Sequence, residues 1–415
     1  MHDQLTHLPV AIIGAGPIGL SAAAQLLKRG FTPILFEAGN QAGANIARWG
    51  HVRMFSPWSY NIDDAAATLL KQQNWPQPAA HEFPTGSELL EQYVTPLAAH
   101  PEINPHLHLN TQVQYVSRLN HDLLRTEGRD QAPFVLRVSS PEGEQDIIAQ
   151  AVIDASGTYQ TPNWLGTHGV PALGESESTE AIAYGVPNIL GSARAQYINR
   201  SVLVVGGGHS AFNALQDLVK LADEHQDMRV LWGVRSTSVT NVVRSPENDE
   251  LQERRRLEVR IQKLLEQGRI EVFTELEIDT IQRKNGKLMV QSGSKALPPV
   301  DRIIAATGFR PNLNLLAELR TSLDPATQSP IRLAPLIDPN LHSCGSVPEH
   351  GLAELSHPEP GLFILGIKSY GRAPTFLLRT GYKQVAAVVS ALGTPEALTI
   401  SQTFTAASAV TTCQG

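Results

Sequence analysis

Cysteine is scarce in this 415-residue chain, which contains only Cys344 and Cys413 and has no CxxC pair. A disulfide framework and a dithiol redox centre are therefore excluded. Cys344 stands near His342, His350 and His357, but this spacing matches no usual structural zinc pattern, so we expect no metal site. The role of Cys344 is left open between an inert thiol and a reactive thiol beside a cofactor.

The sequence also lacks long hydrophobic runs. Its apolar stretches fall far short of the roughly 18 residues that a membrane span needs, and its first residues, MHDQLTHLP, lack the basic and apolar regions of a signal peptide. The net charge is −7, and no basic tract stands apart from helical charge patterning, which argues against a nucleic-acid partner. We expect a cytoplasmic protein of two or three domains, with neither a membrane nor a nucleic-acid partner.

What the chain does contain is a glycine motif between two apolar runs. Residues 10–13 are apolar, Gly14-x-Gly16-x-x-Gly19 follows, and a helix-forming run then extends to residue 27. Strand, tight turn and helix in this order are typical of a dinucleotide-binding βαβ unit, in which the helix start holds the phosphates. The next apolar run, 33–36, ends at Glu37, an acidic residue suited to accept hydrogen bonds from an adenosine ribose.

The same pattern occurs a second time at residues 201–222. A strand leads into Gly206-x-Gly208-x-x-Ala211, and a helix follows. The next strand ends at Arg235 instead of an acid, and a guanidinium can bind a 2′-phosphate through two hydrogen bonds. We therefore predict NADP(H) binding by this second unit, with Ser236 and Thr237 helping; the alternative for Arg235 is a solvated charge at a strand end.

Several strands are predicted to end in small residues that let the backbone pass close to a cofactor. The first, 145–154, leads into Ala155-Ser156-Gly157, and a later one, 300–306, leads into Thr307-Gly308. A third ends at Gly366; the loop after it holds Lys368, Tyr370 and Arg372, and Pro374 is predicted to open a helix as a first-turn residue.

The segments between these motifs are less specific. Residues 38–64 have little periodicity but hold Arg48, Trp49, Arg53 and Phe55, and we interpret them either as an aromatic mini-core under a loop or as a wall of the cofactor and substrate pocket. The other expectations are helices at 85–100 and 249–267, a strand at 107–119, a hairpin in which PEGE joins 134–140 to the run that starts at 145, a crossover at 162–200, a turn at Asn285-Gly286, and a loosely held tail at 394–415.

Together these patterns predict an α/β fold of two Rossmann-like three-layer domains, the second inserted in the first. We place an FAD-binding domain at 1–195 and 311–415 and an NAD(P)H-binding domain at 196–310. The chain resembles the two-dinucleotide-binding-domain flavoproteins over about residues 1–393, through GAGPIGL with Glu37, NTQV, DASGT, VVGGGHSA and ATGFRPN. The resemblance implies FAD in the first unit, a nicotinamide nucleotide in the second, and contact of the Val113 backbone with adenine.

Within that superfamily the chain is most similar to the flavin-containing, class B-like monooxygenases. It lacks the redox cysteines and the Gly-Asp pair of the pyridine nucleotide–disulfide reductases, and GIKSYGRAPTFLL and RMFSP look like monooxygenase segments. It departs from them at Ile189, where the fingerprint has His, at Phe55, where a flavin-side Asn is usual, and at His209, where Asn is usual in the second glycine motif.

The resemblance implies an enzyme in which NADPH reduces FAD and a flavin C4a-(hydro)peroxide oxygenates a small soft nucleophile at sulfur or nitrogen. The alternatives are an NADPH-dependent reductase that passes electrons to a small acceptor or a protein, and a non-catalytic nucleotide sensor. The expected partners are a small-molecule substrate and dioxygen, and homodimer formation is left open. Lys368, Tyr370 and Arg372 are expected to stabilise charge around the isoalloxazine. The expected cofactor-binding residues are Gly14, Gly16, Pro17, Gly19, Glu37, Ala38, Arg48, Trp49, Arg53, Val113, Ala155, Ser156, Gly157, Gly206, Gly208, His209, Ser210, Arg235, Ser236, Thr307, Gly308, Gly366, Thr375 and Phe376.

Overall fold

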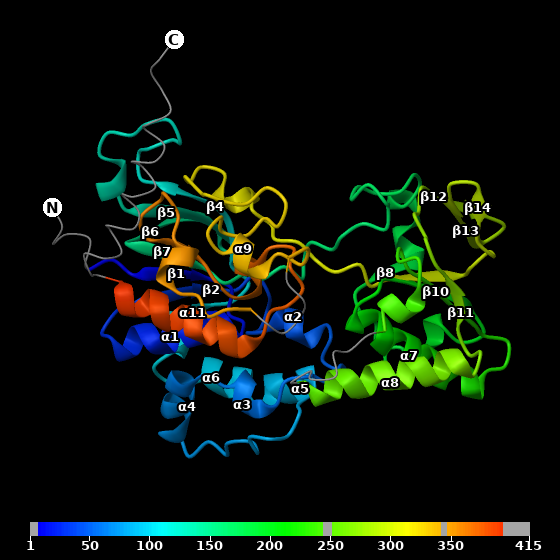
Figure 1. The fold of residues 1–415 in the computed structure, drawn as a ribbon. Coiled ribbons are helices and arrows are strands. Elements are labelled where there is room, and N and C mark those ends of the chain that lie inside the picture. Colours follow the sequence, from blue (N-terminus) through cyan, green and yellow to red (C-terminus); the bar gives the residue numbers. More distant parts are fainter. Residues whose placement is uncertain (1–6, 244–250, 342–346, 393–415) are drawn as a thin grey trace, which may run out of the picture. The chain divides into compact units, whose positions relative to one another are not determined.

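The computed structural model describes residues 7–243, 251–341 and 347–392. It divides into two compact units, the first made of residues 1–47, 56–160 and 310–415 and the second of 48–55 and 161–309. Each unit has its own parallel sheet (Figure 1). Cys344, Cys413, His342 and the expected tail at 394–415 lie outside the described residues.

The first unit is built on a five-stranded parallel sheet in the order β16-β7-β1-β2-β3. Its central strand, β1 (Val10–Ile13), is entirely buried. Ala11 and Ile13 belong to a core shared with a three-stranded antiparallel sheet, whereas Ile12 faces helix α1 (Pro17–Lys28). The strands of the two sheets are β2 (Pro33–Phe36), β3 (Leu107–His108), β7 (Ala151–Asp154) and β16 (Leu362–Ile364), and β4 (Gln112–Arg118), β5 (Phe134–Ser140) and β6 (Gly143–Ala149).

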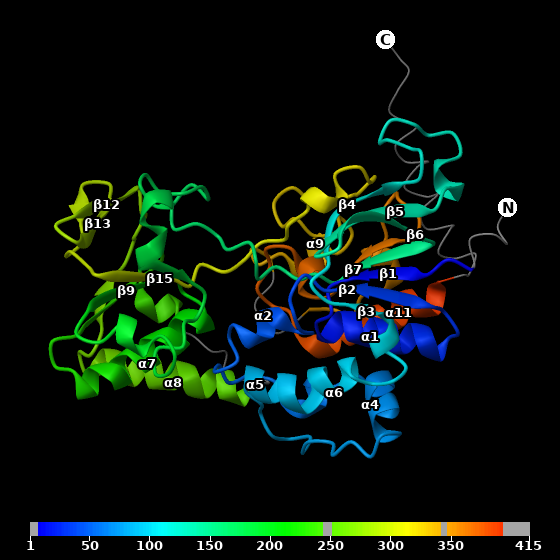
Figure 2. The same ribbon diagram turned by 180° about the vertical axis from the view of Figure 1, so that it is seen from behind.

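Helices form the remaining layer of this unit. The side chain of Ile18 packs so tightly against Gly381 that a Cβ there would lie 2.5 Å from Ile18 Cδ1, which brings α1 and α11 (Leu378–Ala391) side by side (Figures 1 and 2). The shorter helices are α2 (Ala44–Ala47), α3 (Trp58–Asn61), α4 (Asp64–Lys71), α5 (Gly86–Leu89), α6 (Thr95–Ala98), α9 (Ala334–Ile337) and α10 (Leu352–Leu355).

The helix expected at 85–100 is present but is interrupted by a π-helical turn over Leu90–Val94. It begins with a capping box in which the Thr85 side chain accepts from the Glu88 backbone N–H. Pro96 has no N–H to donate to the Gln92 carbonyl four residues earlier. That carbonyl instead accepts a 2.6 Å hydrogen bond from the Trp75 indole, so the interruption leaves it satisfied.

The second unit repeats the architecture. Its parallel sheet has the order β11-β10-β9-β15-β8, and separate cores fill its two faces. One face is covered by α7 (His209–Glu224) and α8 (Gln252–Glu266), and the other packs against the antiparallel strands β12 and β13. The strands are β8 (Ile182–Tyr184), β9 (Ser201–Val205), β10 (Arg229–Gly233), β11 (Glu271–Phe273), β15 (Arg302–Ala305), β12 (Thr280–Lys284), β13 (Lys287–Ser292) and β14 (Lys295–Ala296).

Most sequence expectations on elements hold, with three differences. The turn between β12 and β13 is indeed Asn285-Gly286, both with positive φ, as a tight hairpin turn requires. The expected strand at 107–119 is divided into β3 and β4, with Asn110 in the left-handed region between them. The expected crossover at 162–200 contains β8, whose pairing with β15 adds it to the second sheet, so this unit begins well before residue 196.

The third difference concerns Pro374. The sequence predicts that it opens the last helix, but α11 begins at Leu378, after a stretch without regular structure. Gly366–Tyr370 instead form a 3-10 turn directly after β16. The prediction that Pro374 opens the helix is therefore wrong. Before Pro374 is reached, the chain turns at Gly371 (φ 58°) and packs against the Thr327 carbonyl. Among the described residues, no helix combines the length and apolarity that a membrane crossing demands.

Candidate functional site

The first glycine loop lies where β1 ends and α1 begins. Its three glycines differ in how much space a side chain would have. A Cβ on Gly14 would lie 2.9 Å from the Ala155 carbonyl oxygen, and one on Gly19 would lie 1.9 Å from the Gly14 carbonyl oxygen. These two positions therefore need glycine for the fold itself. Gly16 has φ −78°, and a Cβ there would meet nothing within 4 Å, so the protein alone does not require glycine at this position.

The space beside Gly16 fits a phosphate group. Gly16 caps α1 without a side-chain hydrogen bond, and Pro17 occupies the first helical turn, so the backbone N–H groups of this turn point out of the helix end. An open approach to a helix N-terminus is the geometry that dinucleotide loops offer to a diphosphate.

Glu37 closes the loop on its other side. One carboxylate oxygen accepts from the Ala15 N–H at 3.0 Å, and the other accepts from the Gly39 N–H at 2.8 Å. The side chain is buried at the end of β2, and the exposed Ala38 follows it. Val113, expected beside adenine, is buried in the core between the two sheets, next to an irregularity in the pairing of β4 with β5.

The end of β7 and the turn after β16 are joined by a buried ion pair. Lys368 Nζ donates to Asp154 Oδ2 at 2.6 Å and to Ser156 Oγ at 2.9 Å. Ser156 in turn donates through its N–H and its hydroxyl to Asp154 Oδ1, at 3.1 and 2.6 Å. Both charged side chains have no exposed surface. Lys368 therefore holds two loops together, and its ammonium does not reach the surface where a cofactor would bind.

Gln384 on α11 holds the same turn through two hydrogen bonds. Its amide oxygen accepts from the Gly366 N–H at 2.8 Å, and its amide nitrogen donates to Ser369 Oγ at 2.9 Å. Gly366 has φ 72° and packs on Ile18 at the start of α1. The turn after β16 is thus placed beside the first glycine loop.

The remaining residues expected near the flavin differ in exposure. Tyr370 is buried, and its ring meets the Phe376 ring edge-on at 5.3 Å. Burial raises the pKa of Tyr370 well above its ordinary value, so its hydroxyl stays protonated at physiological pH. Thr375 Oγ1 is buried without a hydrogen-bond partner among the described residues, and Arg372 is exposed. Ala155 and Gly157, at the end of β7, are half-buried.

The second glycine loop has the same division of roles as the first. A Cβ on Gly206 would lie 2.3 Å from the Ala306 carbonyl oxygen, whereas one on Gly208 would meet nothing within 4 Å. Gly208 caps α7, again without a side-chain hydrogen bond, and the exposed Ser210 lies in the first turn. The second unit therefore also has an open helix start suited to a diphosphate.

His209, the first residue of α7, has its ring between the edges of Phe55 and Phe212, at centroid distances of 5.0 and 5.4 Å. Its Nε2 lies 2.9 Å from Glu258 Oε1 on α8. The sequence gives no signal that Glu258 is buried, because α8 is rich in charged residues and an acidic residue in such a helix is expected to be exposed. Gln384 does leave a signal, as a polar residue on the apolar face of its helix.

Residues 48–55 pack within the second unit. Phe55 lies against the core under α7, and burial, the largest effect, lowers the pKa of His51, although Asp217 on α7 opposes this. Arg48 and Arg53 are exposed and Trp49 is half-buried. The packing of Phe55 agrees with the first of the two interpretations of this segment, an aromatic mini-core under a loop.

Further residues expected at the cofactors follow β10 and β15. β10 ends at Gly233, and Arg235 is exposed after the buried Val234; Ser236 Oγ donates to the Ser238 carbonyl. Thr307 Oγ1 donates to the Asn163 carbonyl at 2.6 Å, and the exposed Gly308 follows it.

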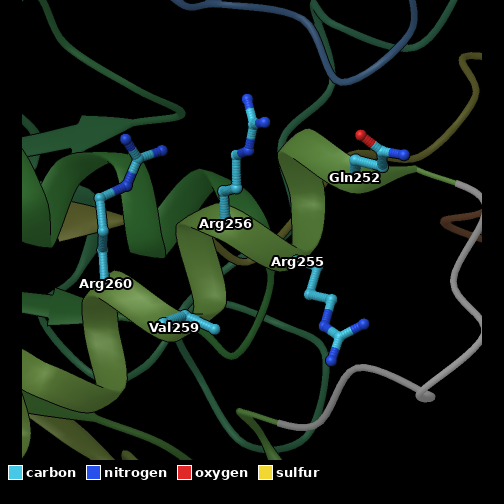
Figure 3. Close-up of a pocket in the computed structure, with 5 residues that line it drawn as sticks. All are labelled: Gln252, Arg255, Arg256, Val259 and Arg260. Carbon is cyan, nitrogen blue, oxygen red and sulfur yellow. The ribbon is translucent and has the colours of Figure 1, made fainter.

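Helix α8 carries the arginine run of residues 254–256. There Arg256 pairs with Glu253, and five side chains line a hollow of about 520 Å³. Figure 3 shows Arg256 and Arg260 pointing to one side of α8 and Arg255 to the other; the hollow is completed by Gln252 and Val259.

Comparison with known proteins agrees with this geometry. Residues 11–332 match the family described as pyridine nucleotide-disulphide oxidoreductase. A flavin-containing monooxygenase of Arabidopsis thaliana, FMO GS-OX3, is 22% identical over 338 residues, covering 76% of this chain and 63% of the relative. A second one from the same plant, FMO GS-OX-like 2, is 23% identical over 248 residues, covering 54% of this chain and 49% of the relative. The chain thus spans about half to two thirds of these relatives.

Solved structures of the same architecture include two bacterial enzymes. The bacillithiol disulfide reductase Bdr (YpdA) of Bacillus cereus has a TM-score of 0.67 and 20% identity, with 95% of this chain and 99% of that chain covered. A flavin-containing monooxygenase of Stenotrophomonas maltophilia has a TM-score of 0.57 and 19% identity, with 92% and 97% covered.

The matched family model and the two glycine loops define the class: the chain belongs to the pyridine nucleotide-disulphide oxidoreductase family. It is an oxidoreductase of this family with two Rossmann-like domains, as the sequence predicts. Its two open helix starts, at Gly16 and Gly208, fit one dinucleotide each.

Proposed function

We propose that this flavoprotein is an NADPH-dependent monooxygenase that oxygenates a small nucleophile at sulfur or nitrogen. One observation carries the proposal: the chain has two open dinucleotide loops, whereas its sequence has no CxxC pair to which a flavin could pass electrons. The similarity to two flavin-containing monooxygenases supports the choice of oxygen as acceptor. Bound FAD would supply the redox chemistry.

The chain's own residues would bind and orient the two nucleotides. The backbone N–H groups at the start of α1 would hold one diphosphate, with Glu37 placed for the ribose that follows it. The start of α7 would hold the second diphosphate, and the exposed Arg235 at the end of β10 would contact the 2′-phosphate that distinguishes NADPH from NADH.

A reductase without oxygen insertion is the second candidate, favoured by one position. Ile189 stands where the monooxygenase fingerprint has His, and it is fully buried in the core of the second unit. Because the Ile189 side chain lies in the core, it cannot take the place of the fingerprint His at a nucleotide site. Electron transfer from NADPH to a small acceptor would need only the two dinucleotide loops.

Isotopic oxygen separates the two candidates. The FAD-loaded protein is supplied with NADPH, heavy dioxygen and a thioether or tertiary amine probe, and the products are analysed by mass spectrometry. A monooxygenase incorporates labelled oxygen into the sulfoxide or N-oxide, and NADPH should be preferred to NADH by roughly 10- to 150-fold if one arginine reads the phosphate. NADPH consumption with complete recovery of hydrogen peroxide and no labelled product would favour the reductase instead.

A further inference from the structure

A chain of hydrogen bonds in the first unit links the segment before α10 to the turn after β16. His350 Nδ1 lies 3.1 Å from the Pro348 carbonyl oxygen, and His350 Nε2 lies 3.0 Å from the amide nitrogen of Gln384 on α11. That nitrogen also donates to Ser369 Oγ at 2.9 Å, while the amide oxygen accepts from the Gly366 N–H at 2.8 Å. Gln384 and Ser369 are fully buried, and His350 is half-buried. The imidazole is therefore connected through one side chain to the backbone of the turn.

The partners in this chain of hydrogen bonds decide where each proton lies. The Gly366 N–H can only donate, so it fixes the oxygen side of the Gln384 amide, and the NH2 group faces His350. Ser369 Oγ gives its own proton to the Gly366 carbonyl at 2.8 Å, so it accepts from Gln384. Because the NH2 group only donates, His350 Nε2 must accept, and because the Pro348 carbonyl only accepts, Nδ1 must donate. The network thus requires a neutral imidazole with its proton on Nδ1.

Three elements hold the His350 imidazole in this place. The N–H of the next residue, Gly351, donates to Glu354 Oε2 on α10 at 2.7 Å. A Cβ on Gly351 would lie 3.8 Å from Ala387 Cβ on α11, one turn after Gln384. On the side of the turn after β16, the His350 ring lies 5.8 Å from the ring of Tyr370. The imidazole is therefore positioned by α10, α11 and the turn together.

Other titratable groups lie on the same elements and on the loop before α10. The charged side chains already have partners, which are Lys383 for Glu349, the Gly351 N–H for Glu354, Asp154 for Lys368, and the ring of Tyr60 for Arg379. Burial raises the pKa of both Tyr370 and Tyr382, so these hydroxyls stay protonated. His350 is therefore the group in this network whose gain of a proton changes the pattern of donors and acceptors.

We infer that His350 is a positioning residue for FAD: its neutral imidazole holds Gln384 in the orientation that fixes the turn after β16, and its protonation weakens FAD binding. Gly366 of this turn packs on Ile18 at the start of α1, beside the first dinucleotide loop. A proton on Nε2 would face the NH2 group of Gln384, donor against donor. The amide could avoid this only by rotating, which would turn its oxygen away from the Gly366 N–H. This inference rests on the proposed function, because it assumes that the first loop binds FAD.

The test measures FAD binding without turnover. The full-length apoprotein is titrated with FAD, followed by flavin fluorescence, between about pH 8 and pH 5.5, a range in which histidine usually changes its charge. We expect the affinity of the native protein to fall by roughly 2- to 10-fold towards the acidic end, as for the loss of one hydrogen bond. His350→Gln keeps an acceptor for Gln384 but cannot gain the proton. It should bind FAD like the native protein at the alkaline end and lose less affinity on acidification.

His350→Leu has neither the acceptor nor the charge, and it should bind FAD roughly 2- to 10-fold more weakly throughout this range. The matched control is His81→Gln, at an exposed histidine of the same unit, which should keep the native pH profile. Thermal unfolding at each pH establishes that every variant is folded. A second readout needs no FAD: nitrogen NMR of the apoprotein with labelled histidine should show the proton of the neutral His350 on Nδ1.

Identical pH profiles for the native protein and His350→Gln would overturn the inference, as would a His350 signal with its proton on Nε2. Native affinity for FAD in His350→Leu would also overturn it. A protein that binds no FAD at any pH would reject the proposed flavin site, and the inference with it. FAD binding that does not respond to the His350 substitutions would instead reject only the role of His350.

Discussion

At the scale of single residues, the two glycine loops separate what the fold needs from what a ligand needs. Gly14, Gly19 and Gly206 are fixed by contacts with the chain's own backbone, whereas Gly16 and Gly208 face open space. A glycine that the protein does not require for packing is explained by close approach of something else.

Gly16→Ala should therefore produce a folded protein that binds FAD poorly. Alanine is compatible with the backbone of Gly16 (φ −78°, ψ −175°), so stability should hardly change, but the new methyl group would occupy the place of a phosphate. We expect an FAD affinity reduced by at least roughly 10- to 150-fold, measured by flavin content and by titration of the apoprotein.

Gly208→Ala is the matched control, since it should keep FAD and lose affinity for NADP(H). If both variants lose FAD equally, or if Gly16→Ala loads FAD normally, the assignment of the first loop to FAD is wrong.

At the scale of elements, the ion pair between Asp154 and Lys368 joins the end of β7 to the turn after β16. Its partners come from strands that are neighbours in the sheet but more than two hundred residues apart in the chain. The sequence predicts that Lys368 acts on the flavin; its complete burial and its two protein partners assign it a positioning role instead.

Substitutions at this pair should show strong non-additivity. Lys368→Met would leave a buried carboxylate without its cation and should cost about 3–5 kcal/mol of unfolding free energy, and Asp154→Leu should cost a similar amount. The double variant Asp154→Leu/Lys368→Met removes both charges and should recover most of this loss. Urea unfolding of the three variants measures the coupling. Additive losses in the double variant would show that the two side chains do not act as a pair.

At the scale of the whole molecule, stability should depend on pH through one buried histidine. His357 has Nδ1 accepting from the Ser322 N–H at 3.2 Å, and Nε2 has no partner among the described residues. Burial lowers the pKa of His357 from 6.5 to about 4. The folded protein therefore keeps this side chain neutral at pH values where the unfolded chain protonates it.

The sign of the effect follows from this lowered pKa. Above pH 6.5 the imidazole is neutral in both states, and the stabilising contribution is complete. As the pH falls from 6.5 towards 4 the unfolded state gains the proton first, and about 2–3 kcal/mol of stability should be lost. Urea unfolding at several pH values should show a flatter profile for His357→Gln, which cannot titrate. Identical pH profiles for the two proteins would place the titrating group elsewhere.

The sequence alone determined the architecture and the two nucleotide loops. Strand, glycine turn and helix are contiguous in the chain, so local spacing predicts both βαβ units, and Glu37 and Arg235 follow from their places at strand ends. The Asn285-Gly286 turn is predictable for the same reason, because its conformation is set by two adjacent residues.

Only the tertiary structure decided which distant residues meet. The pairing of Lys368 with Asp154 and of Gln384 with Gly366 depends on strand order and helix packing, which no local pattern encodes. The predicted start of α11 is wrong for a related reason: docking of Gly371 on the Thr327 carbonyl, a contact across the fold, overrides the local preference of Pro374 for a helix start. Burial and charge pairing are properties of the folded chain: Lys368 is completely buried against Asp154, whereas Arg372 on the same loop is exposed.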